Sequence, residues 1–165
     1  MPALEAGVRA PEINLLFTDG RKFSFSEALK KGPVVAAFFK VSCPVCQFAF
    51  PYLERIYKAY GKSGKFTFLG VSQDDRADTD AFTRRFGVTF PVLLEQKGYA
   101  VSNAYGLTNV PTVFMISPSG EIEFSSVSWS KSEMQELARR LAEVNNTAPV
   151  TIFAAGEQVP EFKPG

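Results

Sequence analysis

The chain has 165 residues, of which 45% are hydrophobic and 21% are charged, so its length and composition fit one globular domain with a substantial core. Eighteen Lys and Arg residues oppose seventeen Asp and Glu residues, and a net charge of +1 provides no basic excess for nucleic-acid binding. The absence of histidine and the presence of only two cysteines exclude Ser-His or Cys-His catalysis and a four-ligand zinc site. We therefore expect no metal, no cofactor and no nucleic-acid partner.

Hydrophobic periodicity predicts strands that alternate with helices along most of the chain. In chain order, the expected elements are a β-hairpin (13–17, 22–25), a short helix (27–31) capped by Ser26, a strand (34–39), a helix (45–60) kinked at Pro51, a strand (66–71), a helix (78–86), an extended segment (90–94), a short helix (99–105), a β-hairpin (112–116, 121–124) and a helix (131–144) capped by Ser130. Residues 34–39 form an uninterrupted apolar run, which is typical of a strand covered on both faces. The order indicates an α/β fold whose sheet is flanked by helices.

The last part of the chain lacks such a period. We expect residues 1–146 to form one domain and residues 147–165 to form a C-terminal extension. Residues 155–162 repeat the pattern Ala-Gly-x-x-small-Pro-Glu-apolar of residues 6–13. This repeat is either a chance similarity or the start of a truncated second domain of the same kind.

The sequence also bears on the cellular compartment. The uncharged run from Val41 to Leu53 is too short and too polar to span a bilayer. The first residues lack the basic and apolar regions of a secretory signal. We expect either a cytoplasmic protein, or a periplasmic or membrane-tethered one whose targeting segment has been removed.

Both cysteines lie in the motif Cys43-Pro44-Val45-Cys46, between a predicted buried strand and a predicted amphipathic helix. Unpaired N–H groups and the helix dipole at such a position stabilise a thiolate on the first cysteine. Cys43 is therefore the expected nucleophile, and Cys46 is expected to resolve the mixed disulfide. Pro44 suits the first helical turn because it has no N–H to leave unsatisfied. The alternative interpretations are half of a zinc ribbon, which lacks a second pair, or two ordinary buried thiols.

A second motif supports dithiol chemistry. Asn109-Val110-Pro111-Thr112 precedes a predicted buried strand, where a proline cannot donate to the sheet and a cis X-Pro bond exposes backbone groups. The segments that carry a wider resemblance are Ala10-Pro11-Glu12, Gly32-Pro33-Val34, Ser42 to Cys46, Phe50 to Leu53, Gly70-Val71-Ser72, Phe90 to Leu94, Val110-Pro111-Thr112 and Ser119-Gly120.

With these segments, residues 8–144 resemble the thioredoxin-like superfamily, and within it the redoxin branch of TlpA-like thiol-disulfide oxidoreductases, which is related to the AhpC/TSA peroxiredoxins. The resemblance implies a thioredoxin fold with an N-terminal β-hairpin and an inserted strand and helix. It also implies that Pro111 is a cis-proline facing the dithiol and that the Val110 backbone pairs with an extended substrate. We expect Pro44 and Val45 to contact the substrate as well. The implied partners are a disulfide-containing protein and an upstream thiol or disulfide electron partner.

The chain departs from its relatives at three positions near the cysteines. Ser42 replaces a usual tryptophan, Ala37 stands where thioredoxins carry a buried aspartate, and Ala49 stands where TlpA-like relatives often carry a glutamate. The buried acids that accept the proton of the second thiol are therefore expected to be missing. Lys40 is the nearest charge, and it is either a tuner of the Cys43 thiolate or simply a solvated side chain.

Two other functions compete with this one. A peroxiredoxin-like thiol peroxidase needs a hydroxyl residue three positions before its reactive cysteine, but Lys40 and Cys43 occupy those positions here. A non-catalytic binding module with the same fold would explain the loss of both acids. The retained cysteines and the Val-Pro-Thr segment argue against it.

Overall fold

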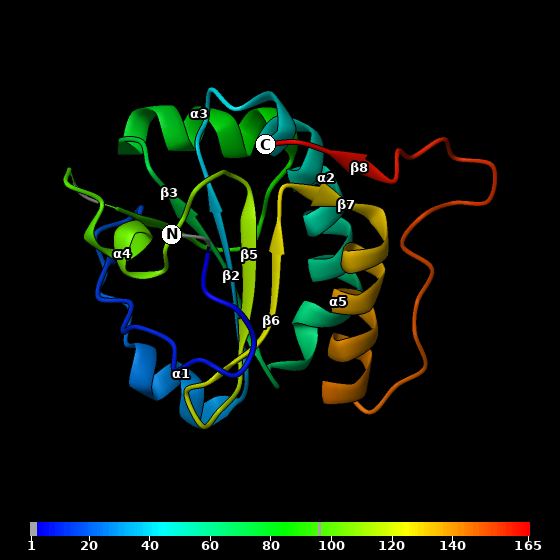
Figure 1. Ribbon diagram of the computed structural model, residues 1–165, viewed down its shortest axis with the longest axis horizontal. Coiled ribbons are helices and arrows are strands. Elements are labelled where there is room, and N and C mark those ends of the chain that lie inside the picture. Colours follow the sequence, from blue (N-terminus) through cyan, green and yellow to red (C-terminus); the bar gives the residue numbers. More distant parts are fainter. Residues whose placement is uncertain (1–2, 96) are drawn as a thin grey trace.

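The computed structural model describes residues 3–95 and 97–165, which form a mixed six-stranded sheet flanked by helices (Figure 1). The elements in chain order are β1 (Leu16–Phe17), α1 (Phe25–Lys31), β2 (Val34–Phe39), α2 (Pro44–Tyr60), a 3-10 turn (Gly61–Ser63), β3 (Thr67–Ser72), α3 (Arg76–Phe86), β4 (Val92–Leu94), α4 (Ala100–Ala104), β5 (Thr112–Ile116), β6 (Ile122–Val127), β7 (Trp129–Ser130), α5 (Lys131–Val144) and β8 (Phe162–Lys163). The predicted α/β class is confirmed.

The main sheet has the strand order β1-β4-β3-β2-β5-β6. β2, β3 and β4 run parallel, whereas β5 pairs with β2 in the antiparallel sense, and β6 with β5. β1 pairs with β4, and a single bridge from Leu16 to Lys22 closes the short N-terminal hairpin. β4 and α4 are the strand and helix inserted between α3 and β5. This topology places β2, which leads directly to the cysteines, in the middle of the sheet.

All six residues of β2 are fully buried, because side chains alternate between two cores on opposite faces of the sheet. Val35, Ala37 and Phe39 belong to the core that contains residues of α2, α3 and α5. The other residues of β2 belong to the core formed with α1, α4 and the N-terminal segment. The strand that carries the site is thus held from both sides.

The cap of α1 differs from the prediction. Ser24, not Ser26, is the N-cap, and its hydroxyl accepts the N–H of Glu27 at 3.3 Å. Ser24 and Glu27 have the spacing of a capping box, and Phe25 is already buried in the first turn. At the other end of the domain, the predicted cap of α5 is confirmed, since Ser130 accepts the N–H of Glu133.

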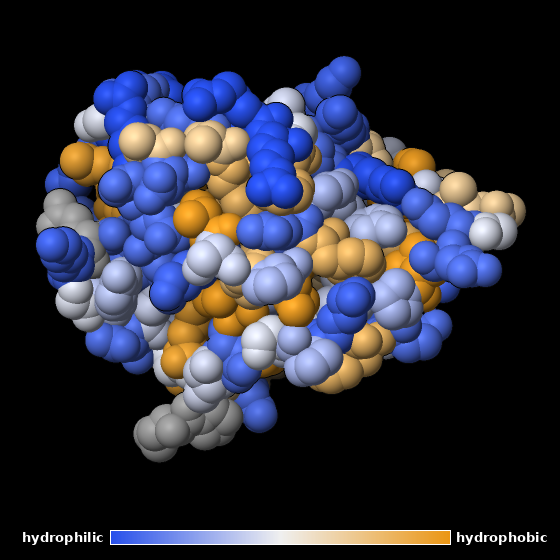
Figure 2. Space-filling model, turned by 90° about the horizontal axis from the view of Figure 1, so that it is seen from above, coloured by the Kyte–Doolittle hydropathy of each residue, from blue (hydrophilic) through white to orange (hydrophobic). Residues whose placement is uncertain are grey.

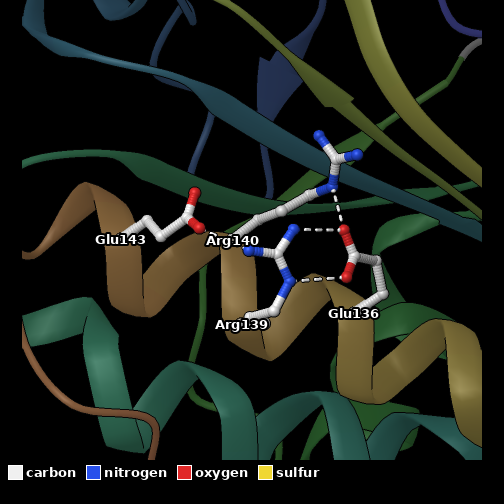
Figure 3. Close-up of polar contacts among 4 residues, drawn as sticks. All are labelled: Glu136, Arg139, Arg140 and Glu143. Atoms are coloured by element: carbon white, nitrogen blue, oxygen red, sulfur yellow. Dashed lines mark hydrogen bonds and ion pairs between the residues drawn. The ribbon is translucent and has the colours of Figure 1, made fainter.

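An ion-pair network covers the outer side of α5 (Figure 3). Glu136 accepts two hydrogen bonds from Arg139, each 2.7 Å long, and one from Arg140 at 2.8 Å. Arg139 also pairs with Glu143, one helical turn further on. The guanidinium groups of Arg139 and then Arg140 lower the pKa of Glu136 to about 2.

The segment after α5 folds back along the domain instead of leaving it. Arg55 of α2 makes a two-pronged ion pair with Glu157, and Ile152 is buried. β8 then pairs with β7 in a separate two-stranded sheet. These two strands were not predicted, since two-residue strands carry no measurable period. The proposed division at residue 146 stays a prediction. In residues 3–95 and 97–165, every helix falls short of the length and apolar character needed to cross a bilayer.

Candidate active site

Cys43 and Cys46 lie at the start of α2, beside the C-terminal end of the central strand β2 (Figure 1). Cys43 is the N-cap residue, and Pro44 occupies the first helical turn as expected. The backbone N–H of Cys46 donates to Cys43 Sγ over 3.2 Å. Cys43 is partly exposed and Cys46 is fully buried. Cys43 is therefore accessible to a substrate, whereas Cys46 is shielded in the first turn of α2.

The segment before β5 completes the site from a distant part of the sequence. The Val110–Pro111 peptide bond is cis, and the Cys43 thiol donates to the Val110 carbonyl over 3.4 Å. This proximity follows from the sheet register, because Phe38 near the end of β2 pairs with Thr112 at the start of β5. Pro111 is buried beneath the loop, whereas Val110 is half-buried.

The environment of Cys46 disfavours its thiolate. Burial is the largest cause and raises the pKa of the Cys46 thiol, and the hydrogen bond with Cys43 raises it further. Electrostatic interactions with Cys43 and with the Asp74 carboxylate raise the pKa as well, whereas a hydrogen bond with the Lys40 backbone opposes these effects. Cys46 is thus held as a neutral thiol until something takes its proton.

Two side chains fix the loop between β2 and Cys43 by binding the Val41 backbone. Asp74 accepts the Val41 N–H at 2.8 Å, and Gln47 Nε2 donates to the Val41 carbonyl at 2.9 Å. From the sequence alone, Asp74 and Asp75 would both be expected in a solvated loop that opens a helix, because Asp is favoured near a helix N-terminus. For Asp75 this is confirmed, since it caps α3 by accepting the Asp78 N–H.

Asp74, in contrast, belongs to the site. A positional signal existed in the sequence, because Val41 and Asp74 each follow the end of neighbouring parallel strands by two residues. The carboxyl ends of such strands meet at one edge of the sheet. The 2.8 Å contact is what that geometry produces.

Comparison with known proteins agrees with this architecture. Residues 6–125 match the sequence model of the AhpC/TSA family. The chain belongs to the AhpC/TSA family. It is 30% identical over 121 residues to the thiol-disulfide oxidoreductase ResA of Geobacillus thermodenitrificans, covering 73% of this chain and 68% of the relative. The predicted membership of the redoxin, TlpA-like branch of the thioredoxin superfamily is confirmed.

Solved structures support the fold of this AhpC/TSA-family chain. A putative protein disulfide isomerase from Bacteroides thetaiotaomicron superposes with a TM-score of 0.79 at 22% identity, over 87% of this chain and 94% of the other. A putative thiol:disulfide interchange protein DsbE from Chlorobium tepidum gives 0.74 at 23% identity, over 86% and 99% of the two chains. At these identities the likeness shows the fold alone.

Two positions are apolar here where, by the resemblance, thioredoxins carry a buried aspartate and TlpA-like proteins often carry a glutamate. Ala37 is fully buried in β2, and Ala49 is buried in α2. Glu54 is a buried carboxylate further along α2, but it accepts the N–H of Thr89 at 2.8 Å and the Thr89 hydroxyl at 2.5 Å. Its hydrogen bonds therefore secure the loop before β4.

The remaining predicted residues surround the dithiol to different degrees. Pro44 is exposed beside Cys43, and Val45 is half-buried on the first turn of α2. Lys40 is exposed at the end of β2, and its role as a tuner of Cys43 stays a prediction. Phe90 is buried, so its side chain is not part of the surface beside the dithiol. Figure 2 looks onto this edge, where apolar side chains lie among hydrophilic ones.

Within the ranges 3–95 and 97–165, no three His, Cys, Asp or Glu side chains gather closely enough to hold a metal ion. A pocket beside β1 and α4 is lined in part by Leu15, Leu94 and Val101, and neither cysteine contributes to it. The two thiols and the Val110 loop are therefore the group of residues whose chemistry suits a candidate active site.

Proposed function

We propose that this protein is a thiol-disulfide oxidoreductase that reduces or exchanges disulfides of protein substrates. The observation that carries the proposal is the position of Cys43. Its sulfur is partly exposed, receives the Cys46 N–H at 3.2 Å, and lies 3.4 Å from the Val110 carbonyl. N–H donation at a helix start stabilises negative charge on sulfur, which is the nucleophilic form. The relative named thiol-disulfide oxidoreductase ResA supports the same activity.

The reaction proceeds in two exchanges. The Cys43 thiolate attacks one sulfur of the substrate disulfide, which forms a mixed disulfide and releases the other substrate sulfur as a thiolate. Cys46 then loses its proton and attacks Cys43 Sγ, which releases the second substrate thiolate and forms the Cys43–Cys46 disulfide. Two electrons pass from the dithiol to the substrate. An upstream dithiol partner restores the reduced pair, and the reverse sequence oxidises a substrate.

The Val110 backbone contributes to substrate binding in this proposal. An extended polypeptide that brings its sulfur to Cys43 passes beside the Val110 carbonyl, which lies 3.4 Å from Cys43 Sγ. Pairing of backbone groups with an extended chain gives affinity without requiring a particular sequence. Pro44 and Val45 add uncharged contact surface next to the nucleophile.

The test is reduction of insulin disulfides by the protein in the presence of a dithiol reductant. We expect Cys43→Ser to abolish catalysis, and Cys46→Ser to accumulate mixed disulfides that mass spectrometry of the non-reduced protein detects. Full activity in Cys43→Ser would overturn the assignment of the nucleophile. Rapid consumption of hydrogen peroxide would favour a thiol peroxidase instead, and inertness towards every disulfide would favour a binding module. Titration of the dithiol against glutathione separates a reductant from an oxidant.

A further inference from the structure

The C-terminal segment Glu161–Gly165 reaches the same loop that faces Cys43. β8 pairs with β7, with Trp129 opposite Lys163. Beyond that pair, the N–H of Gly165 donates to Ser128 Oγ at 2.9 Å, and the Gly165 carbonyl accepts from Asn109 Nδ2 at 2.8 Å. Figure 1 shows the red end of the chain beside the start of α2. Residues more than fifty positions apart thus meet at the site.

Gly165 packs directly on the Val110 carbonyl. A Cβ atom placed on Gly165 would lie 2.2 Å from the Val110 oxygen and 3.0 Å from its carbonyl carbon. The same oxygen lies 3.4 Å from Cys43 Sγ. The Val110 N–H makes no hydrogen bond with any part of the chain that the structure describes. The Val110 carbonyl therefore contacts both the nucleophile Cys43 and the C-terminal segment, whereas the Val110 N–H remains available for a hydrogen bond.

The segment is held by backbone pairing and polar contacts, whereas the stretch that precedes it also has a buried side chain. Upstream, Trp129 Nε1 donates to the Pro160 carbonyl at 2.8 Å, Arg55 pairs with Glu157, and Ile152 is buried. Beyond Pro160, most residues are exposed, including Phe162 at 60%. Short, exposed strands with few buried contacts lie at the low-stability end of a structure and open first. The attachment points of the segment are thus a two-residue strand pair and a few polar contacts.

We propose that Glu161–Gly165 occupies the polypeptide-binding surface of the active site and must move aside before a protein substrate can bind. This inference rests on the proposed function, and it concerns how access of protein substrates to the active site is regulated. Gly165 and a substrate chain that contacts the Val110 carbonyl cannot occupy the same position at the same time. β8 on β7 is bound in the manner of β-augmentation, which is also how extended substrates are recognised. Small disulfides need only Cys43 Sγ, so the segment discriminates against polypeptides.

The test uses full-length Gly165→Ala, whose added Cβ would meet a backbone oxygen and so displace the segment. We expect insulin reduction to rise by about 2- to 10-fold, the effect of losing one hydrogen bond from the docked state. Reduction of the small aromatic disulfide DTNB should stay unchanged. Ser128→Ala removes the acceptor of the Gly165 N–H and should act in the same direction. Val150→Ala is the matched control, because that side chain is exposed and lies outside Glu161–Gly165.

A second measurement does not depend on turnover. The rate at which a bulky poly(ethylene glycol) maleimide labels Cys43, relative to iodoacetamide, should rise in Gly165→Ala and Ser128→Ala and stay constant in Val150→Ala. Unchanged or slower insulin reduction in both displaced variants, with normal DTNB reduction, would overturn the proposal. Failure of the wild-type protein to reduce either disulfide would instead overturn the proposed function, and the labelling ratio would still decide whether the segment covers Cys43.

Discussion

The N–H of Val41 and the carboxylate of Asp74 are joined by a 2.8 Å hydrogen bond that connects the loop after β2 to the loop after β3. This bond holds the Asp74 carboxylate near the dithiol. The positions at which the resemblance implies buried acids hold Ala37 and Ala49 instead. Asp74 also contributes to the raised pKa of Cys46. The charge balance around the second thiol therefore depends on a residue outside the motif and its helix.

Replacing Asp74 by Asn should lower the pKa of the Cys46 thiol. The substitution removes a negative charge that opposes formation of the thiolate, whereas burial, the larger cause, still keeps the pKa raised. The pH dependence of Cys46 alkylation in the reduced protein, quantified by peptide mass spectrometry, measures this change as a shift toward lower pH. Asp75→Asn is the control, because Asp75 is exposed and caps α3. An equal shift in both variants would contradict the role of Asp74.

The two thiols should differ sharply in alkylation. At neutral pH we expect iodoacetamide to modify Cys43 and to leave Cys46 unmodified, because Cys46 is fully buried and its pKa is raised. As pH rises, a larger fraction of Cys46 becomes thiolate and its labelling should accelerate. Peptide mass spectrometry quantifies both sites, and denaturant should abolish the difference. Equal labelling in the folded protein would show that Cys46 is not shielded.

Replacing Glu54 by Gln should destabilise the protein by about 1–3 kcal/mol. The Glu54 carboxylate accepts hydrogen bonds from the backbone and hydroxyl of Thr89, and a carboxamide has one acceptor oxygen in place of two. Urea denaturation measures the loss. Glu12→Gln, at an exposed position, should stay within about 0.5 kcal/mol of wild type. A similar loss in both variants would refute a specific role for Glu54.

The effect of Glu136→Gln should depend on pH. The pKa of Glu136 is lowered to about 2 in the folded protein, so its ion pairs stabilise the fold above the ordinary carboxyl pKa and weaken as pH falls toward 2. Because the network is partly exposed, solvent screening limits its contribution to about 1 kcal/mol or less. At neutral pH the variant should lose about 2–4 °C of Tm at most, and this difference should shrink as pH falls below the ordinary carboxyl pKa and vanish only below about pH 2. A difference that persists in strong acid would contradict the ionic cause.

The sequence predicted those parts of the fold that repeat a local pattern. The run at 34–39 became β2 with the predicted bounds, since six apolar residues in a row fit only a strand covered on both faces. The Cys-x-x-Cys motif was located at the start of α2 because Pro44 and the following apolar stripe mark a helix start. These features depend on neighbours in the chain.

Features that depend on distant partners were not predicted. β7 and β8 pair across more than thirty residues, and each alone is too short to show a period. Asp74 looked like one more acidic loop residue, because its partner is a backbone N–H on another strand's loop. The path of residues 147–165 back to Val110 is likewise set by tertiary contacts, among them the pair Arg55–Glu157.

The burial of β2 also has a consequence for how the chain folds. Val34–Phe39 is uncharged, rich in β-forming residues and free of proline, which is the composition of segments that stack between chains when exposed. Before helices cover it, this strand is a site for intermolecular pairing. Lys30 and Lys31 precede it and Lys40 follows it at once, so positive charge borders the apolar run on both sides. Flanking charges of this kind oppose aggregation. Lys40 therefore has an expected role during folding that is independent of the Cys43 thiol.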